Sequence, residues 1–282
     1  MRHAQTVYFN GKLHVGGGIT TGGVSTDCLV YTYDPYTNTW GSLPPAPVYY
    51  AAPVVFNNAL HLIGGRLAST NQRTNKVWTF DELSGKWIKS IPPMPTSRSS
   101  ATAVAYNESI IVAGGIGEGG RHVKTIEVFL NGIWQEESVV LPKACSWMKF
   151  AIHGQNLYLA GGLDQGTNVF CAQLGSFPHP FNRVSGIQVL SSAPYLYSSH
   201  EICHGLLLGV GGQSLQGKNT ISIYSYSPLT FSWVEVGVLQ VACSAASICF
   251  IQIPYGGLFV IGGSTDATQS STHVFRAQVI SE

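Results

Sequence analysis

A pair of adjacent glycines returns six times along the chain, each time after a short apolar stretch. Successive pairs are 47, 50, 47, 50 and 51 residues apart, counted between their second glycines. Residues 56–65 show the unit: Phe-Asn-Asn-Ala-Leu-His-Leu-Ile-Gly-Gly. A repeat of this length indicates a solenoid, a propeller or an array. The pairs are Gly17-Gly18, Gly64-Gly65, Gly114-Gly115, Gly161-Gly162, Gly211-Gly212 and Gly262-Gly263.

Each unit has a second half that ends in an aromatic residue. Polar and apolar residues alternate there between turn residues, as in Val30-Tyr31-Thr32-Tyr33 before Asp34-Pro35. Alternation at period two, bounded by turns, predicts strands, and four short strands per unit form one antiparallel sheet. In five units the aromatic follows the second glycine by 19 to 22 residues: Trp40, Trp87, Trp134, Phe181 and Trp233. We expect these five to be structurally equivalent.

These motifs resemble the kelch repeat over nearly the whole chain. The match consists of a strand, the glycine pair, Tyr33-Asp34-Pro35, the tryptophan, and Pro93-Met94-Pro95 before Arg98. The resemblance implies an all-β, six-bladed β-propeller of four-stranded antiparallel blades, because such sheets bury their faces by stacking around an axis. We expect one domain over 1–282, with blades at about 1–43, 44–91, 92–141, 142–190, 191–239 and 240–282.

The last blade is expected to lack its outer strand. The spacing that places the aromatic in earlier units lands at or beyond Glu282 when it is counted from Gly263. The strand from Thr272 to Ile280 should then lie at the outer edge, where unpaired backbone groups favour association. A chain with native flanking residues that supply the missing strand should melt at a higher temperature.

The composition favours a large apolar interior and excludes some partners. Hydrophobic residues make up 45% of the chain and charged residues 10%, with a net charge of +1. This balance argues against a nucleic-acid or membrane surface. No run of eighteen apolar residues occurs, and a strand from Ala4 to Phe9 leaves no room for a signal peptide.

The cysteine pattern is typical of an intracellular protein. Six cysteines occur without a CxxC pair, mostly in or beside predicted strands. We interpret them as buried thiols and predict a cytoplasmic location. The single sequon Asn107-Glu108-Ser109 is weighed as a chance match.

An enzyme is the alternative interpretation. It would act on a sugar or small molecule in the axial pocket, in the manner of galactose oxidase or of sialic-acid isomerases of this fold. His14 and His61 share one register and are interpreted as packed strand residues. His200 and His204 flank Cys203, but a metal site needs further ligands. We therefore predict no catalytic residue, no metal and no cofactor.

The favoured function is binding through one loop face. In the family that the chain resembles, partners dock where the loops between second and third strands meet the links between blades. Ten of the fifteen Lys and Arg residues fall between Arg66 and Lys149. We predict a protein or peptide partner, acidic or phosphorylated, because arginine holds carboxylates and phosphates with paired hydrogen bonds. The candidate residues are Arg66, Arg73, Arg98, Arg121, Tyr50, Trp147 and Tyr195.

The resemblance also implies roles for such a module within larger proteins. Kelch propellers commonly recruit substrates for ubiquitin ligases or act as cytoskeletal adaptors. The chain carries no BTB, F-box or BACK-like helical segment that would specify one of these roles. The role in a ubiquitin ligase is therefore an expectation from the family alone.

Overall fold

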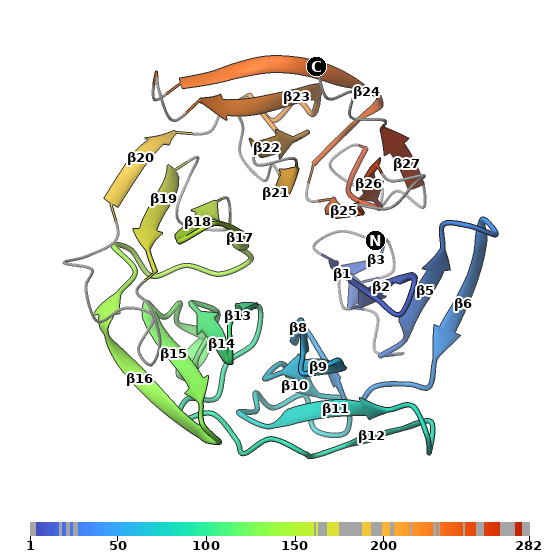
Figure 1. The fold of residues 1–282 in the computed structure, drawn as a ribbon, viewed down its shortest axis with the longest axis vertical. Coiled ribbons are helices and arrows are strands. Elements are labelled where there is room, and N and C mark those ends of the chain that lie inside the picture. Colours follow the sequence, from blue (N-terminus) through green and yellow to red (C-terminus); the bar gives the residue numbers. More distant parts are fainter. Residues whose placement is uncertain are drawn as a thin grey trace.

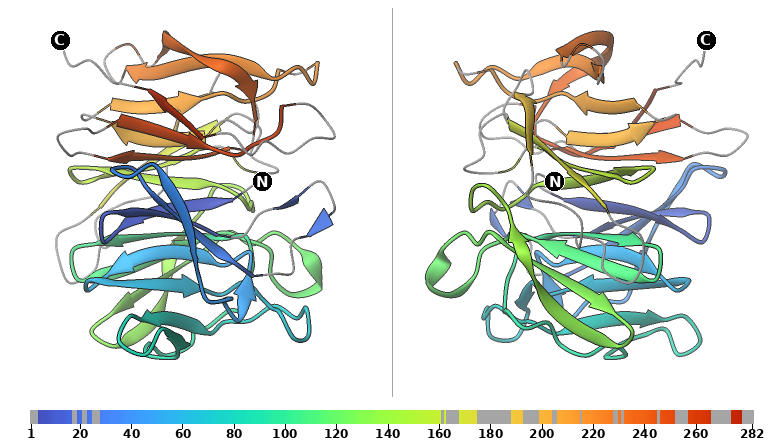
Figure 2. Two further views of the ribbon diagram at one scale, coloured as in Figure 1. Left: turned by 90° about the vertical axis from the view of Figure 1, so that its right-hand side faces the viewer. Right: turned by 60° about the vertical axis from the view of Figure 1, so that its left-hand side comes forward.

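The computed structural model describes residues 4–16, 19–20, 23–24, 28–160, 162, 168–174, 188–192, 199–203, 206–214, 216–227, 230, 232–244, 246–251, 257–265 and 274–277. These residues form antiparallel sheets arranged in a ring (Figure 1). The inner strands run roughly along the ring axis, and the connections between strands lie on two opposite faces (Figure 2). The described residues contain a single helical element, the 3-10 turn Glu118–Gly120, and none of them forms a helix long enough to span a bilayer.

The first three blades are formed by strands between Gln5 and Val140. Each has its inner strand near the axis and its outer strand at the rim. Blade one is β1 (Gln5–Phe9), β2 (Lys12–Gly16), β5 (Val30–Asp34) and β6 (Thr39–Leu43). Blade two is β8 (Ala52–Phe56), β9 (Ala59–Ile63), β11 (Val77–Asp81) and β12 (Lys86–Ile88). Blade three is β13 (Thr102–Tyr106), β14 (Ser109–Ala113), β15 (Thr125–Leu130) and β16 (Ile133–Val140).

The remaining repeats continue around the ring. Blade four is β17 (Lys149–His153), β18 (Asn156–Ala160), β19 (Asn168–Gln173) and β20 (Gln188–Ser192). Blade five is β21 (Ser199–Cys203), β22 (Leu206–Val210), β23 (Thr220–Ser227) and β24 (Ser232–Cys243). The sixth repeat gives β25 (Ser247–Ile251), β26 (Gly257–Ile261) and β27 (Val274–Ala277). Two short pairs lie in the connections: β3 (Ile19–Thr20) with β4 (Gly23–Val24), and β7 (Val48–Tyr49) with β10 (Arg66–Leu67).

Among the described residues, five blades have all four strands, whereas six blades were expected, the last without its outer strand. The sixth repeat contributes a three-stranded sheet among the described residues, with β27 at its edge. The inner strands close the ring, because β25 contacts β1 on one side and β21 on the other. The tryptophans of four repeats occupy equivalent positions, each opposite an aromatic residue of the neighbouring strand: Trp40, Trp87, Trp134 and Trp233. Phe181 lies outside the described residues.

Local sequence explains the tight hairpins. Asn10 and Gly11 both have positive φ, 46° and 74°, between β1 and β2. Asn131 (φ 51°) and Gly132 (φ 81°) repeat this arrangement between β15 and β16. Two-residue turns with positive φ match the twist of antiparallel strands, and Asn-Gly adopts that geometry at low cost.

The glycine pairs join neighbouring blades. Gly114 has φ +62°, and a Cβ there would lie 2.6 Å from the carbonyl oxygen of Cys145 in the next link. The N–H of Gly115 donates to the same carbonyl at 2.7 Å. Gly64-Gly65 with Arg98, and Gly211-Gly212 with Cys243, repeat both contacts. At these three blades the first glycine of the pair lies where a Cβ would meet the backbone of the next link.

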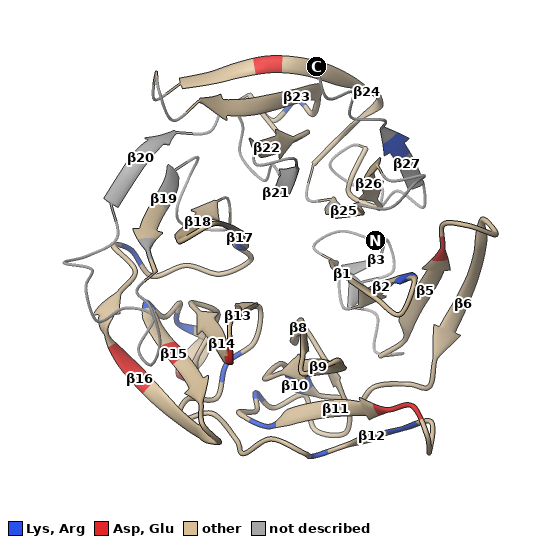
Figure 3. Cartoon of the chain, in the orientation of Figure 1, with Lys and Arg blue, Asp and Glu red and all other residues tan. Residues whose placement is uncertain are grey.

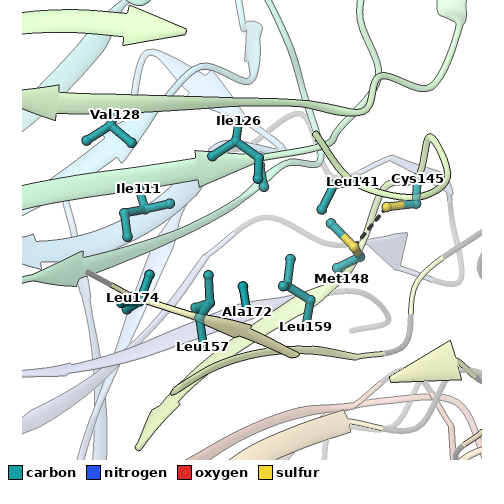
Figure 4. Close-up of a cluster of buried hydrophobic side chains, with 11 residues drawn as sticks. Ile111, Ile126, Val128, Leu141, Cys145, Met148, Leu157, Leu159, Ala172 and Leu174 are labelled. Atoms are coloured by element: carbon teal, nitrogen blue, oxygen red, sulfur yellow. Dashed lines mark hydrogen bonds between the residues drawn. The ribbon is translucent and has the colours of Figure 1, made fainter. Parts of the chain in front are cut away.

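The core consists of side chains packed between adjacent blades. Figure 4 shows the layer between blades three and four, in which Ile111, Ile126 and Val128 face Leu157 and Leu159. The link between these blades adds Leu141, Cys145 and Met148 to the same cluster, with Cys145 Sγ next to Met148 Sδ. Because each blade buries its faces only against its neighbours, the loops are left to vary on a rigid frame.

Candidate binding face

The loops and links named from the sequence meet on one face of the ring. Arg66 lies in the loop between the second and third strands of blade two, and it pairs with Tyr49 of the link that precedes this blade. Ser99 forms a bridge to Ile116 in the corresponding loop of blade three, and Ser244 forms one to Ser264 in that of the sixth repeat. Each of these links therefore packs against the loop of the blade that precedes or follows it, and the side chains of both are presented together.

Three consecutive links are connected by main-chain hydrogen bonds. Tyr50, Ser100 and Trp147 all have left-handed backbone, with φ of 55°, 56° and 60°. The N–H of Ser100 donates to the carbonyl of Tyr50 at 2.8 Å, and the N–H of Trp147 donates to that of Ser100 at 2.9 Å. Non-glycine residues rarely adopt this conformation, so its recurrence at equivalent positions marks a feature that the surrounding structure imposes.

Two of these links place aromatic rings against each other. The rings of Tyr50 and Trp147 meet edge to face with centroids 5.0 Å apart, and Tyr49 meets Tyr50 at 5.1 Å. Both Tyr50 and Trp147 are partly exposed. Burial raises the pKa of Tyr50, followed by the neighbouring Tyr49 hydroxyl, while Arg66 opposes the shift. Tyr50 and Trp147 therefore lie in contact, and their role in binding a partner stays a prediction.

Arg66 and Arg73 lie beside the aromatic residues and next to each other. They form an antiparallel bridge within the loop of blade two. Among the described residues, no carboxylate lies within ion-pair distance of either guanidinium. The Nε–H of Arg73 is buried and has no hydrogen-bond acceptor there. Burial lowers the pKa of Arg73, and the charge of Arg66 lowers it further. The arrangement leaves two adjacent positive charges uncompensated.

The orientation of Arg66 is held by Asn71 and Tyr49, neither of which is among the candidate binding residues. Arg66 donates from one terminal nitrogen to the backbone oxygen and to Oδ1 of Asn71, at 2.7 and 3.0 Å. The hydroxyl of Tyr49 donates to the same Oδ1. Asn71 has φ +57°, which its position in a loop rich in Ser, Thr and Asn could have suggested. With one nitrogen held in this way, the other donors of Arg66 remain for a ligand.

Arg98 is not on the surface, so its expected role in this face is wrong. Its side chain is fully buried and forms an ion pair with the buried Glu127 on β15. It also donates to the carbonyls of Gly114 and Thr125, both at 3.1 Å, and to Thr125 Oγ1 at 2.8 Å. The physical reason is that a carboxylate 29 residues away compensates a charge that would otherwise stay in water.

The other candidates are only partly placed. Arg121 is exposed on the loop of blade three that corresponds to the Arg66–Arg73 loop, and its carbonyl accepts from the N–H of Gly117 at 2.8 Å. Tyr195 lies outside the described residues. Figure 3 shows Lys and Arg concentrated around blades two and three and the start of blade four.

The alternative of an enzyme finds little support in the described side chains. His61 is buried and bonded to Thr79 Oγ1 (2.8 Å) and the carbonyl of Phe56 (3.1 Å), as a packed strand residue would be. Burial raises the pKa of Cys243 to about 11, which makes it a poor nucleophile. The cavity behind Tyr49 and Tyr50 measures about 20 Å³, room for one water molecule.

The remaining metal candidates belong to the fifth repeat. His200 and Cys203 belong to β21, and His204 lies outside the described residues. Within the described part of the chain, no three His, Cys, Asp or Glu side chains come close enough to hold a metal ion. Among the described side chains, no disulfide joins any of these cysteines: Cys28, Cys145, Cys171, Cys243 and Cys249.

Several curated proteins are similar to this chain, and three of them are described here. Kelch-like protein 35 of Mus musculus is 27% identical over 251 residues, which are 86% of this chain and 40% of that protein. Beta-scruin of Limulus polyphemus is 27% identical over 189 residues, 61% of this chain and 20% of that protein. Kelch repeat and BTB domain-containing protein 1 of camelpox virus is 23% identical over 88% of this chain and 43% of its own length. No protein-family model matches the chain.

A solved structure, that of YjhT, shares the fold. The TM-score is 0.78, and the match covers 99% of this chain and 95% of that one at 15% identity. At that identity the likeness concerns the fold alone. The chain spans less than half the length of the curated relatives named above.

Proposed function

Because the chain is a kelch-repeat protein folded as a β-propeller, we propose that it is a binding module that receives an acidic or phosphorylated peptide of a partner protein on this loop face. The observation that carries the proposal is the adjacent pair Arg66 and Arg73, uncompensated by any described carboxylate and flanked by Tyr49 and Tyr50. Two neighbouring guanidiniums repel each other, and a bound anion relieves that repulsion.

The aromatic pair supplies the second part of the recognition. Tyr50 and Trp147 present partly exposed rings whose mutual contact limits their freedom before a partner arrives. Aromatic and arginine side chains carry most of the energy at protein interfaces. The peptide would place its anionic group on Arg66 and Arg73 and an apolar residue against the Tyr50–Trp147 pair. Arg121, and Tyr195 in a later link, would extend the contact to one side or the other.

The wider role follows from the family resemblance. One relative is named for a BTB domain in addition to kelch repeats. Within a longer polypeptide, a module of this kind would recruit a substrate to a ubiquitin ligase in the cytoplasm. In this role the propeller performs no catalysis and needs no cofactor.

The test is a binding titration with peptides captured from an array of acidic and serine-phosphorylated sequences. Changing both Arg66 and Arg73 to alanine should weaken binding at least about 30-fold, the effect of losing about 2 kcal/mol at a hot spot. Lys86→Ala, an exposed residue on β12 of the same blade, is the matched control and should change little.

Salt dependence provides a second readout. The affinity of the wild-type protein for the peptide should fall as ionic strength rises. This dependence of affinity on ionic strength should be weaker in the Arg66/Arg73 double variant. Capture of only neutral or basic peptides, or equal binding by the double variant and Lys86→Ala, would show that the basic pair is solvated surface.

A further inference from the structure

The loop that carries Arg66 and Arg73 is closed by its own backbone. The two arginines pair in an antiparallel bridge at the base of the loop. Above this bridge, the N–H of Leu67 donates to the carbonyl of Gln72 at 2.9 Å. Residues 68–70, Ala-Ser-Thr, are exposed in the turn that remains. The tip of the loop is therefore held close to the arginines at its base.

Thr70 lies on the side of the turn that leads back to Arg73. Its Oγ1 accepts the backbone N–H of Gln72 at 3.4 Å. The next residue, Asn71, accepts two hydrogen bonds from one terminal nitrogen of Arg66, through its carbonyl and its Oδ1. The hydroxyl of Thr70 thus lies one residue from the group that holds Arg66, and beside the amide donor of the residue before Arg73.

The loop carries positive charge that no described group offsets. Residues 66–75 contain two arginines and no Asp or Glu. Among the described residues, neither guanidinium forms an ion pair, and the Nε–H of Arg73 is buried without an acceptor. A phosphate monoester brings nearly two negative charges at neutral pH and three strong acceptor oxygens. Phosphate on the Thr70 hydroxyl would supply both the charge and the acceptors that this loop lacks.

We propose that Thr70 is a phosphorylation site whose phosphate binds Arg66 and Arg73 of the same loop and so occupies the anion site of the binding face. A protein kinase would transfer the γ-phosphoryl group of ATP to Oγ1. The new P–O bond forms as the bond to the β-phosphate oxygen breaks, ADP leaves, and the hydroxyl proton passes to the kinase. The N–H of Gln72 and the donors of both guanidiniums that are not already engaged would then bind the phosphate oxygens.

The regulatory consequence rests on the proposed function, because it concerns the same two arginines. A phosphate attached to the loop is present at a high local concentration, so it competes with an anionic group that arrives from solution. Phosphorylation of Thr70 would therefore turn off the binding of an acidic or phosphorylated peptide, while the contact between Tyr50 and Trp147 is kept.

The first experiment asks whether the folded protein accepts phosphate at Thr70. The 282-residue protein is incubated with ATP and with serine/threonine kinases that phosphorylate a synthetic peptide copying residues 64–76, and the modified positions are mapped by mass spectrometry. Thr70 should be modified, and Thr74 of the same loop should not, because Thr74 is only 4% exposed. Modification of Ser69 alone, or of the peptide but not of the folded protein, would overturn the assignment.

The second experiment measures the contact itself and needs no partner. Phosphorus NMR follows the second ionisation of a phosphothreonine installed at position 70, whose pKa is about 6 without neighbours. Nearby guanidiniums favour the dianion, so this pKa should fall by about one. The pKa should return toward its ordinary value in the Arg66→Ala/Arg73→Ala background and stay low with Lys86→Ala, an exposed residue of the same blade. An unshifted pKa in the otherwise unchanged protein would overturn the proposal.

The third experiment tests competition with phenyl phosphate, a small phosphate monoester. Its binding is followed through the Nε–H resonances of Arg66 and Arg73. Both resonances should shift in the unmodified protein, and at least about tenfold more phenyl phosphate should be needed when Thr70 carries phosphate. Equal binding with and without phosphate on Thr70 would contradict occupation of the anion site.

The outcomes separate this inference from the proposed function. Binding of phenyl phosphate to the unmodified protein, together with an unshifted phosphothreonine pKa, would reject the role of Thr70 and leave the peptide-binding face as proposed. A lowered pKa in a protein that captures no acidic or phosphorylated peptide would reject the proposed function, whereas the contact of the Thr70 phosphate with Arg66 and Arg73 would stand.

Discussion

Replacement of Arg98 by alanine should be among the most destabilising single changes in this protein. The side chain joins the link before blade three to the strands of that blade through Glu127, Thr125 and the carbonyl of Gly114. Burial lowers the pKa of Arg98, and the charge of Glu127 opposes that shift. Without the guanidinium, the carboxylate of Glu127 would remain fully buried with no opposite charge.

The expected magnitude follows from these contacts. Breaking a buried ion pair by removing one partner costs about 3–5 kcal/mol, mainly because the other charge is left without compensation. The carbonyls of Gly114 and Thr125 would lose a charged donor as well. Replacing both partners with apolar residues of similar size, Arg98→Met with Glu127→Leu, should cost much less than the sum of the single changes.

The assay is chemical denaturation of the wild type, Arg98→Ala, and the closed cycle of Arg98→Met, Glu127→Leu and the double variant Arg98→Met/Glu127→Leu. A coupling energy of about 2 kcal/mol or more between the two sites is expected, within the range for residues of one network. A cost below about 1 kcal/mol for Arg98→Ala, the range of surface substitutions, would refute the conclusion that the pair is buried.

Further expectations concern the glycine pairs and the buried histidines. Gly114→Ala and Gly85→Ala both replace a glycine with φ near +63°, but of the two only Gly114 would place its Cβ against a neighbouring carbonyl. We expect Gly85→Ala to lower the free energy of unfolding by about 1 kcal/mol and Gly114→Ala to lower it clearly more. Equal melting temperatures of the two variants would contradict this. Burial lowers the pKa of His14 and His61 below 6.5. As the pH falls, these histidines therefore bind protons in the unfolded chain before they do so in the folded one. The folded protein should keep its full stability above pH 6.5 and lose stability as the pH falls below it. Denaturation curves at pH 7.5 and 5.5 should differ less in a His14→Gln/His61→Gln variant than in the wild type, and an unchanged difference would count against this origin.

The periodic features of the fold could be predicted because each one is local. Glycine pairs, Asn-Gly turns and the tryptophan register each depend on a few neighbouring residues, and the blades follow from repeating them. Arg98 could not be placed in the same way, because its sequence context resembles that of an exposed link residue. Its burial depends on Glu127, which reaches it only after two strands of the next blade have paired.

The candidate binding face rests on the resemblance to the kelch repeat, which led us to expect Arg66, Arg73, Tyr50 and Trp147 on one loop face. That these residues bind a partner stays a prediction. The hydrogen bonds from Tyr49 and Arg66 to Asn71 depend on a left-handed residue within a loop, which periodicity does not reveal. Those contacts decide which nitrogen of Arg66 is occupied and which are available.

The main-chain hydrogen bonds from Tyr50 to Ser100 to Trp147 bear on how such a face can change over evolution. The three positions carry a phenol, a hydroxyl and an indole, yet the backbone contact between successive links is the same. The backbone atoms of these residues therefore hold neighbouring blades together, while their side chains set the chemistry of the face. Substitutions at these positions can therefore change the side chains presented on the face while the backbone hydrogen bonds between the links are kept.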